Sequence, residues 1–129
     1  MVLAILLFGC PDKDGFNSNA TILIRNNSTE RVVEYREYSP LEDTLLQVSS
    51  PFTSIDYVES GTILPNGEKK VLEEKEAIAR LGSIHLYLIN RDTLESVSWQ
   101  RIRLENIVLR RYDLTLDSLE ALNWLLEYP

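Results

Sequence analysis

The sequence predicts a mainly β domain, a β-sandwich with two or three short helices; the alternative is an α+β fold built on an antiparallel sheet. Short segments rich in β-branched and aromatic residues recur along the chain, separated by Gly, Pro, Asn and Ser. Only two or three segments switch to helix formers, and no internal repeat is visible. A chain of 129 residues is long enough for one domain with its own core.

The composition argues against several classes of partner. Acidic residues number 20 and basic residues 13, which gives a net charge of −7. An acidic protein repels phosphate backbones, so nucleic acid is not expected as a partner, and anionic lipid head groups are disfavoured for the same reason. Cys10 is the only cysteine, so neither an internal disulfide nor a multi-cysteine zinc site can form.

The first ten residues have the pattern of an export signal. Met1–Phe8 is an uncharged apolar run, too short to span a bilayer but long enough for the core of a signal peptide. It leads into Leu7-Phe8-Gly9-Cys10, which resembles the lipobox of bacterial lipoproteins. The resemblance implies a signal peptide over residues 1–9, cleavage before Cys10 and a lipid on that cysteine. The alternative is that residues 1–10 form a buried first strand.

Residues 10–19 are expected to be the lipidated cysteine and a flexible tether, and residues 20–129 a single globular domain. Pro, Gly, Asn, Asp and Ser dominate the tether, which shows no apolar periodicity. Its acidic residues, Asp12 and Asp14, are compatible with sorting of a lipoprotein to the cell surface.

Two strands are predicted at the start of the domain. Ala20–Arg25 is rich in β-branched residues, and Asn26-Asn27-Ser28 supplies turn residues after it. Glu30–Tyr38 follows with a partial alternation of side chains, so the two segments together suggest a hairpin. Prolines interrupt residues 39–51, where Leu45–Val48 is a candidate for a short strand.

A second hairpin is predicted in the middle of the chain. Thr53–Val58 alternates apolar and polar side chains, as in a strand. Gly61–Leu64 leads into Pro65-Asn66-Gly67-Glu68, in which Asn-Gly is a strong signal for a type I′ hairpin turn. Lys69–Leu72 would be the returning strand.

A helix and a central strand are predicted next. Glu73–Leu81 consists of helix formers with an acidic first turn, and Gly82 marks its end. Ile84–Ile89 is the most apolar run of the domain and predicts a strand inside a sheet. Asn90–Thr93 is then expected to turn the chain.

The last third contains one ambiguous segment, Thr93–Asn106, in which Trp99, Ile102 and Asn106 are spaced for one face of a helix.

Ile107–Leu114 is a strand by residue type. Thr115 is predicted to be the N-cap of a helix that ends near Asn123, and Trp124–Tyr128 would be the final strand.

Two resemblances extend beyond the lipobox. The succession of a strand, N-N-S, a second strand, I-L-P-N-G-E and a returning strand resembles immunoglobulin-like and fibronectin-like domains of bacterial envelopes, which implies an immunoglobulin-like β-sandwich. The run Ile84–Pro129, with I-H-L-Y-L-I-N-R-D-T-L, S-W-Q-R-I, I-V-L-R-R-Y-D-L-T-L-D-S-L and L-N-W-L-L-E-Y-P, resembles small uncharacterised lipoproteins of gut-type Gram-negative bacteria. It implies lipid anchoring in the cell envelope, with the outer membrane favoured, and no particular activity.

The sequence offers little for catalysis or cofactor binding. His85 is the only histidine and lies in an apolar run, where a structural role is far commoner than a catalytic one. There is no G-x-S-x-G, G-x-G-x-x-G or Walker motif, so neither triad chemistry nor a nucleotide cofactor is expected.

Carboxylates are numerous, and none of them stands out as a catalytic or metal-binding group. The acidic residues of 73–76 suit a helix start, and neither Asp12 with Asp14 nor Glu42 with Asp43 belongs to a calcium-binding loop. We therefore expect no metal, no cofactor and no enzyme activity. A hydrolase that uses two carboxylates is the least favoured hypothesis, and two acids converging in a deep pocket, one of them protonated, would support it.

The candidate ligand-binding residues are arginines and tryptophans of the last third of the chain: Trp99, Arg101, Arg103, Arg110, Arg111 and Trp124. The arginine pairs could bind phosphate or an acidic sugar; the alternative is charge balance with acids such as Glu105 and Asp113. The tryptophans, together with Tyr112 and Tyr128, could stack on sugar rings; the alternative is that these rings are core anchors.

The favoured function is a non-catalytic interaction or structural module anchored to the cell envelope, such as an accessory subunit of a protein complex. The second hypothesis is a lipoprotein that binds a glycan or a small anion. The expected partners are the membrane, through the lipid on Cys10, and an envelope protein complex.

Overall fold

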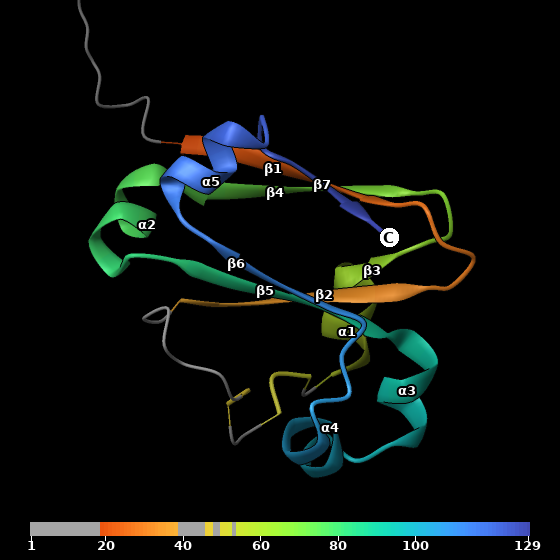
Figure 1. Cartoon of the computed structure of the whole chain (residues 1–129). Coiled ribbons are helices and arrows are strands. Elements are labelled where there is room, and N and C mark those ends of the chain that lie inside the picture. Colours follow the sequence, from red (N-terminus) through yellow and green to blue (C-terminus); the bar gives the residue numbers. More distant parts are fainter. Residues whose placement is uncertain (1–18, 39–45, 48–49, 53) are drawn as a thin grey trace, which may run out of the picture.

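The protein has a mixed α/β fold with two open sheets, as the computed structural model shows for residues 19–38, 46–47, 50–52 and 54–129 (Figure 1). A three-stranded sheet has the order β4-β1-β7, with strands β1 (Asn19–Asn26), β4 (Glu68–Glu74) and β7 (Leu125–Tyr128). A four-stranded sheet has the order β3-β2-β5-β6, with strands β2 (Val32–Tyr38), β3 (Thr62–Ile63), β5 (Ile84–Asn90) and β6 (Arg110–Leu114).

The helices of the described chain number five and are all short, against the two or three that the sequence suggested. They are α1 (Ile55–Gly61), α2 (Lys75–Leu81), α3 (Arg91–Ser96), α4 (Trp99–Glu105) and α5 (Leu116–Ala121). The expectation of a mainly β protein is therefore corrected to a mixed fold. The predictions for residues 1–18, for Glu42 and Asp43, and for both ends of Leu45–Val48 lie outside the described residues.

The main core lies between the two sheets. Ile22 and Ile24 from β1 face Leu86 and Leu88 from β5, and all four side chains are fully buried. Apolar side chains of α2 and α5 join the same core, and both helices lie at one end of the two sheets (Figure 1). Burial of this kind contributes about 25 cal/mol per Å² of apolar surface and holds the sheets together.

A second core lies on the other face of the four-stranded sheet, on the side of α3 and α4 (Figure 1). Tyr35 of β2 stacks on Tyr87 of β5 at 5.8 Å between ring centroids, and Trp99 packs edge-on against Tyr35. Strand β5 is consequently buried on both faces, which explains why Ile84–Ile89 is apolar without alternation.

Several local predictions are confirmed. The strands predicted at Ala20–Arg25, Ile84–Ile89 and Trp124–Tyr128 are present as β1, β5 and β7 within one or two residues. Gly82 ends α2 at φ 95°, a conformation that favours glycine. Thr115 caps α5 in a capping box with Ser118.

The other predicted strands are also present, with shifted boundaries. Strand β2 occupies most of Glu30–Tyr38, β4 extends the predicted Lys69–Leu72, and β6 covers only the second half of Ile107–Leu114. The predicted helix Glu73–Leu81 begins two residues later, because Glu73 and Glu74 still belong to β4.

The strand predicted at Thr53–Val58 is wrong, because its described part, residues 54–58, caps and begins helix α1. The side chain of Ser54 accepts a hydrogen bond from the backbone N–H of Tyr57 at 3.2 Å and caps the helix. Likewise, the predicted turn Asn90–Thr93 is the start of α3, capped by Asn90, and the ambiguous segment after it contains α4. N-caps at the start of a helix outweighed the strand and turn signals at these points.

Neither predicted hairpin exists. Strands β1 and β2 belong to different sheets, and so do β3 and β4. The turn between β3 and β4 is not type I′: Asn66 alone has a positive φ, 61°, and the N–H of Gly67 donates to the carbonyl of Leu64 at 2.8 Å, as in a type II turn with Pro65 at its second position. The β1–β2 and β3–β4 connections therefore carry the chain from one sheet to the other.

Candidate functional site

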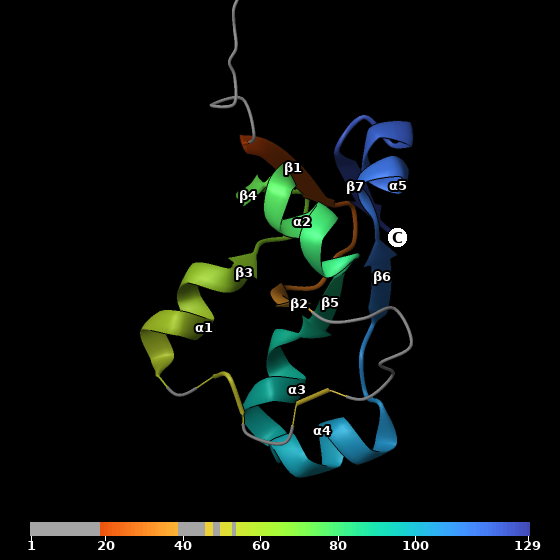
Figure 2. The ribbon, with the colours of Figure 1, turned by 90° about the vertical axis from the view of Figure 1, so that its left-hand side faces the viewer.

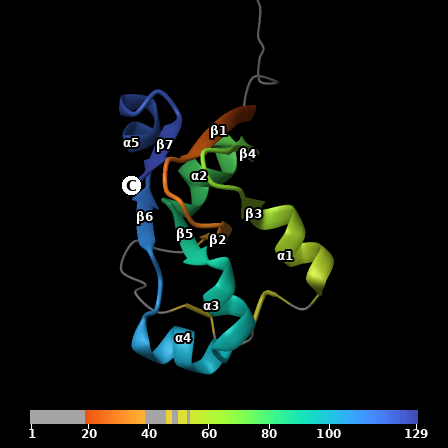
Figure 3. The same ribbon diagram turned by 90° about the vertical axis from the view of Figure 1, so that its right-hand side faces the viewer.

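A pocket of about 340 Å³ lies where β2, β4 and α1 meet. Its lining consists of Glu34, Tyr35 and Arg36 from β2, Tyr57, Ser60 and Gly61 from α1, and Lys69 from β4. Figures 2 and 3 show α1 and β4 on one side of the molecule, with β6, β7 and α5 on the other. Its volume is at the lower end of the range of about 300–1,000 Å³ that small-molecule sites occupy.

Charged side chains of β2 line the pocket because successive side chains of a strand point to opposite faces of its sheet. Val32, Glu34 and Arg36 share the face that is turned toward the three-stranded sheet, and Val32 belongs to the main core. Strand β3 pairs only with Val32 and Val33, so Glu34 and Arg36 lie beyond its end. The inward face of β2 therefore changes from apolar to charged at the edge of the core.

Arg36 joins two buried carboxylates. Its Nε donates a hydrogen bond to Oε2 of Glu34 at 3.1 Å, and its Nη1 donates to Oε2 of Glu73 on β4. Glu34 and Glu73 are only 5% and 4% exposed, so this guanidinium links the two sheets through charges that water scarcely reaches. Burial raises the pKa of the Glu34 carboxyl, and the positive charges of Arg36 and Lys69 offset only part of that rise.

The second oxygen of Glu34 is available to a ligand. Glu34 lines the pocket, and its one hydrogen bond within the described residues is made by Oε2 to Arg36, which leaves Oε1 without a partner there. Oε1 itself is not fully buried, since Nε of Arg91 is the one fully buried side-chain polar atom without a hydrogen bond among the described residues. The pocket thus offers an acceptor for a donor that a ligand would bring.

Helix α1 supplies the opposite wall. The ring of Tyr57 is 45% exposed and packs edge-on against Phe52 at 5.8 Å between centroids. Lys69 reaches across from β4 and donates to the backbone carbonyl of Ser60 at 2.7 Å. Gly61 permits the close approach to β2, because a Cβ at this position would lie 3.1 Å from the carbonyl oxygen of Glu34.

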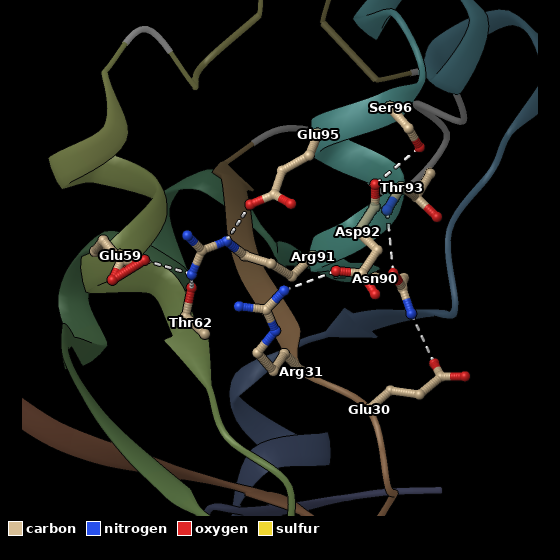
Figure 4. Close-up of polar contacts among 10 residues, drawn as sticks. All are labelled: Glu30, Arg31, Glu59, Thr62, Asn90, Arg91, Asp92, Thr93, Glu95 and Ser96. Atoms are coloured by element: carbon tan, nitrogen blue, oxygen red, sulfur yellow. Dashed lines mark hydrogen bonds and ion pairs between the residues drawn. The ribbon is translucent and has the colours of Figure 1, made fainter.

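A buried arginine fixes the end of α1 to the rest of the fold (Figure 4). Arg91, at the start of α3, is 7% exposed and donates from Nη1 to the hydroxyl of Thr62 at 3.0 Å. The same group forms an ion pair with Glu59 of α1, and its Nε lies 3.3 Å from Oε2 of Glu95. This brace positions the helix that carries Tyr57 and Ser60.

His85 takes part in a different cluster, on the other face of the four-stranded sheet. It is fully buried, and its Nδ1 lies 2.7 Å from Oδ1 of Asp113, which also accepts a hydrogen bond from Nε of Arg111 at 2.6 Å. Burial by itself would raise the pKa of Asp113, but the hydrogen bonds from Arg111 and His85 outweigh burial and lower that pKa. The geometry supports the structural interpretation of His85, since the pocket lies on the opposite face.

The residues singled out in the sequence do not form one site. Trp99, Arg101 and Arg103 all lie on α4. The indole of Trp99 donates to the carbonyl of Gln47 at 3.0 Å, Arg103 donates to that of Leu46 at 2.7 Å, and Arg101 forms an ion pair with Glu105 on the same helix. Trp99 and Arg103 thus attach α4 to residues 46–47.

The remaining three lie elsewhere. The guanidinium of Arg110 is 5.6 Å from the ring centroids of both Tyr112 and Tyr128, and Arg111 belongs to the cluster of His85. Trp124 packs on the main core, with Lys75 over its ring at 5.7 Å. Trp99 and Trp124 therefore lie against different cores, so they form no common platform for a sugar.

Sequence reasoning missed the pocket residues Glu34, Arg36, Tyr57 and Lys69. One signal was present: two charged residues follow Val32 at intervals of two in a strand whose other face is apolar or aromatic. Charges at core-facing positions of a strand require partners, and this pattern marks them as a paired, buried group. The partner Glu73 could not be found in this way, because it was assigned to a helix.

In comparisons with known proteins, no family model, no curated protein and no solved structure matches the chain. In the described part of the chain, no group of His, Cys, Asp and Glu side chains could hold a metal ion. No helix among these residues is long and apolar enough to cross a membrane.

Proposed function

We propose that this chain is a lipid-anchored protein of the bacterial cell envelope whose folded domain is a non-catalytic binding module. Its ligand site would be the pocket between β2, β4 and α1. The observation that carries this proposal is Glu34, a buried carboxylate that lines the pocket with one oxygen unengaged in the described chain. Binding sites of small molecules combine a concave surface with a few fixed polar groups, and the pocket has both features.

The arrangement of the acids favours binding over hydrolysis. Glu34 and Glu73 both interact with Arg36, but only Glu34 lines the pocket. A glycosidase needs two carboxyl groups that flank the scissile bond, one of which passes a proton to the leaving group. A carboxylate held against a guanidinium away from the pocket is poorly placed for either role, so the hypothesis of a carboxylate hydrolase gains little support.

The cellular location rests on the sequence. Leu7-Phe8-Gly9-Cys10 has the pattern of a lipobox, and Asp12 and Asp14 follow the cysteine in a short polar stretch before β1. We propose that a lipid on Cys10 holds the domain at the outer membrane. A single acyl chain gives only marginal anchoring, whereas several chains on one cysteine give stable anchoring.

Substitution of Cys10 by alanine is expected to release the protein from the membrane. Without its thiol, residue 10 cannot receive the lipid, so the chain should move from the detergent-extracted membrane fraction to fractions without membrane. The measurement is fractionation with intact-mass analysis, in which the wild-type chain should carry added acyl mass on residue 10. A wild-type chain of full length without acyl mass would refute the anchor.

The binding function is tested by the thermal stability of the full-length chain with a panel of small polar compounds: neutral sugars, sugar acids, amino acids and inorganic phosphate. A ligand that fills the pocket stabilises the folded state by mass action, so at saturating concentration it should raise the melting temperature by several degrees. The rise should disappear in Tyr57→Ala, which alters the pocket wall. A panel without any such compound would refute the proposed function.

A second candidate is the interaction module without a small ligand. Leu72 of β4 is 66% exposed and Leu64 is 61% exposed, and these two side chains are the apolar groups that a docking partner could cover. Gentle solubilisation of the lipidated protein, with stoichiometry read by mass spectrometry, tests it. A partner in fixed ratio that is lost in Leu72→Ser would establish a subunit of a complex, whereas isolation without a partner would argue against one.

The finer description of the architecture also stays a proposal. Seven strands in two sheets agree with the count of a constant-type immunoglobulin domain, and this count is what supports an immunoglobulin-like sandwich. The parallel pairing of β1 with β7 and the five helices of the described chain set it apart from such a domain.

A further inference from the structure

We propose that the pocket between β2, β4 and α1 takes a neutral, polyhydroxylated ring, that is, an uncharged sugar unit. This inference rests on the proposed binding function and names the chemical class of its ligand. It is carried by the pairing of the charged groups in the pocket, by the kinds of hydrogen-bonding groups that line it, and by one exposed aromatic ring.

The charged groups at the pocket are already engaged. The lining carries one carboxylate, Glu34, and two cations, Arg36 and Lys69, and Arg36 is also paired with Glu73, which lies outside the lining. Both cations therefore have partners before any ligand arrives. An uncharged ligand needs no counter-charge from the site and loses the least hydration on entry.

A small anion fits poorly. Arg36 already donates to two carboxylates, and Lys69 already donates to the carbonyl of Ser60. An anion placed near either cation would also meet the carboxylate of Glu34 at short range. A cation is disfavoured for the converse reason, since Arg36 and Lys69 both line the pocket.

The hydrogen-bonding groups suit hydroxyls. A hydroxyl both donates and accepts, and vicinal hydroxyls do so side by side. Oε1 of Glu34 can only accept while it is ionised, whereas the ammonium of Lys69 has three donors, of which one is used by Ser60 within the described chain. The hydroxyl of Tyr57 can do either and has no partner among the same residues. Neighbouring hydroxyls of a sugar would thus satisfy an acceptor and donors at once, and hydrogen bonds to charged groups are the stronger kind.

Tyr57 supplies the apolar surface that a sugar ring also needs. Its ring lines the pocket, is 45% exposed and is held edge-on by Phe52. An aromatic ring of this kind presents a flat apolar body beside a polar hydroxyl. The C–H groups on one face of a sugar match that body, while its hydroxyls point to the polar groups across the pocket.

The test is isothermal titration of the full-length chain, extracted in a detergent without a sugar head group, with D-glucose, D-galactose, D-mannose and N-acetyl-D-glucosamine. D-Glucuronate and inorganic phosphate probe the anionic alternative, and D-glucosamine probes the cationic one. We expect at least one neutral sugar to bind with a dissociation constant in the millimolar range or below, and more tightly than each charged probe.

Two variants assign that binding to the pocket. Glu34→Gln keeps the size of the side chain but removes its charge, and it should weaken binding about tenfold or more, the effect of losing a charged hydrogen bond. Tyr57→Ala removes a side chain that is 45% exposed on α1 and should weaken binding by a similar factor. The matched control is Glu68→Gln, an exposed acid on β4 that interacts with Arg25, and it should leave affinity within about twofold of wild type.

The outcomes separate the two proposals. Tighter binding of glucuronate, phosphate or glucosamine than of any neutral sugar, abolished by Tyr57→Ala, would overturn the sugar assignment and keep the pocket as a binding site. Binding of a neutral sugar that neither variant weakens would remove the sugar from this pocket. Absence of binding by every probe would overturn the sugar assignment, and absence in the wider panel as well would overturn the binding function.

Discussion

Replacement of Arg36 by methionine is expected to lower the free energy of unfolding by about 3–5 kcal/mol at neutral pH. Methionine keeps much of the length of the side chain but removes the guanidinium that joins Glu34 to Glu73. Both carboxylates would stay buried without the guanidinium that bonds to them, which is far costlier than an absent ion pair on the surface. Chemical denaturation of the full-length chain, followed by circular dichroism, measures the effect.

The loss should depend on pH in a defined direction. Burial already raises the pKa of Glu34, and Arg36 is the largest influence that lowers it, so the substitution should raise that pKa further. A carboxyl whose folded pKa exceeds its unfolded value of about 4.3 stabilises the fold below that value and loses this contribution as pH rises through the folded pKa. Arg36→Met should therefore be more stable near pH 5 than near pH 8, with a steeper fall than wild type. Equal slopes for the two proteins would contradict the role given to Arg36.

The chain contains a matched control for this prediction. Arg25 also contacts two glutamates, with Nε 2.7 Å from Glu68 and Nη1 3.2 Å from Glu127, but all three side chains are at least one-third exposed. Solvent screens such pairs, so Arg25→Met should cost far less than Arg36→Met. A similar cost for the two substitutions would show that burial does not set the strength of the Arg36 network.

Replacement of Asn26 by alanine is expected to cost about 3 kcal/mol, which corresponds to a fall in melting temperature of at least about 10 °C. Asn26 is fully buried at the end of β1. Its Nδ2 donates to the carbonyls of Glu30, Ile63 and Leu64, and its Oδ1 accepts from the backbone N–H and the hydroxyl of Ser28. Alanine would leave buried groups of the β1–β2 and β3–β4 connections without partners.

Two further variants check this explanation. Asn26→Asp retains the shape but points a carboxylate oxygen at three carbonyls, so it should destabilise the fold at least as much as alanine. Asn27 is exposed, and Asn27→Ala should change stability by less than about 0.5 kcal/mol. Thermal melts of the three variants decide: an effect of Asn26→Asp close to that of Asn27→Ala would contradict the proposed network.

The candidate site was the least predictable part of the molecule. The lone His85 was expected to be structural, and its burial and its contact with Asp113 support that interpretation. The arginines and tryptophans chosen from the sequence are instead distributed over α4, β6 and the turn before β7, because a linear pattern of residue types does not show which of them share a surface. The pocket brings together Glu34 of β2, Tyr57 of α1 and Lys69 of β4. The two strands belong to different sheets, and the third element is a helix.

The sequence by itself determined the features that depend on neighbouring residues. Gly82 ends a helix because its positive φ suits glycine, Thr115 begins one through its hydroxyl, and the apolar run Ile84–Ile89 is a strand that is buried on both faces. Where two local signals compete, contacts with the rest of the fold determine the secondary structure. Thr53–Val58 has the alternation of a strand, yet the cap at Ser54 and packing against β2 make it the start of a helix.

Only the tertiary structure decided which strands pair. The turns predicted after Ala20–Arg25 and at Pro65-Asn66-Gly67-Glu68 are present. The strands on either side of each turn nevertheless belong to different sheets, because their apolar faces pack against each other across the core. Strands that are distant in the chain can pair in several ways. The favoured pairing is the one that buries the most apolar surface while polar groups such as Asn26 and Arg36 keep their hydrogen bonds. The pocket depends on that pairing, since it exists only where an edge of one sheet meets an edge of the other.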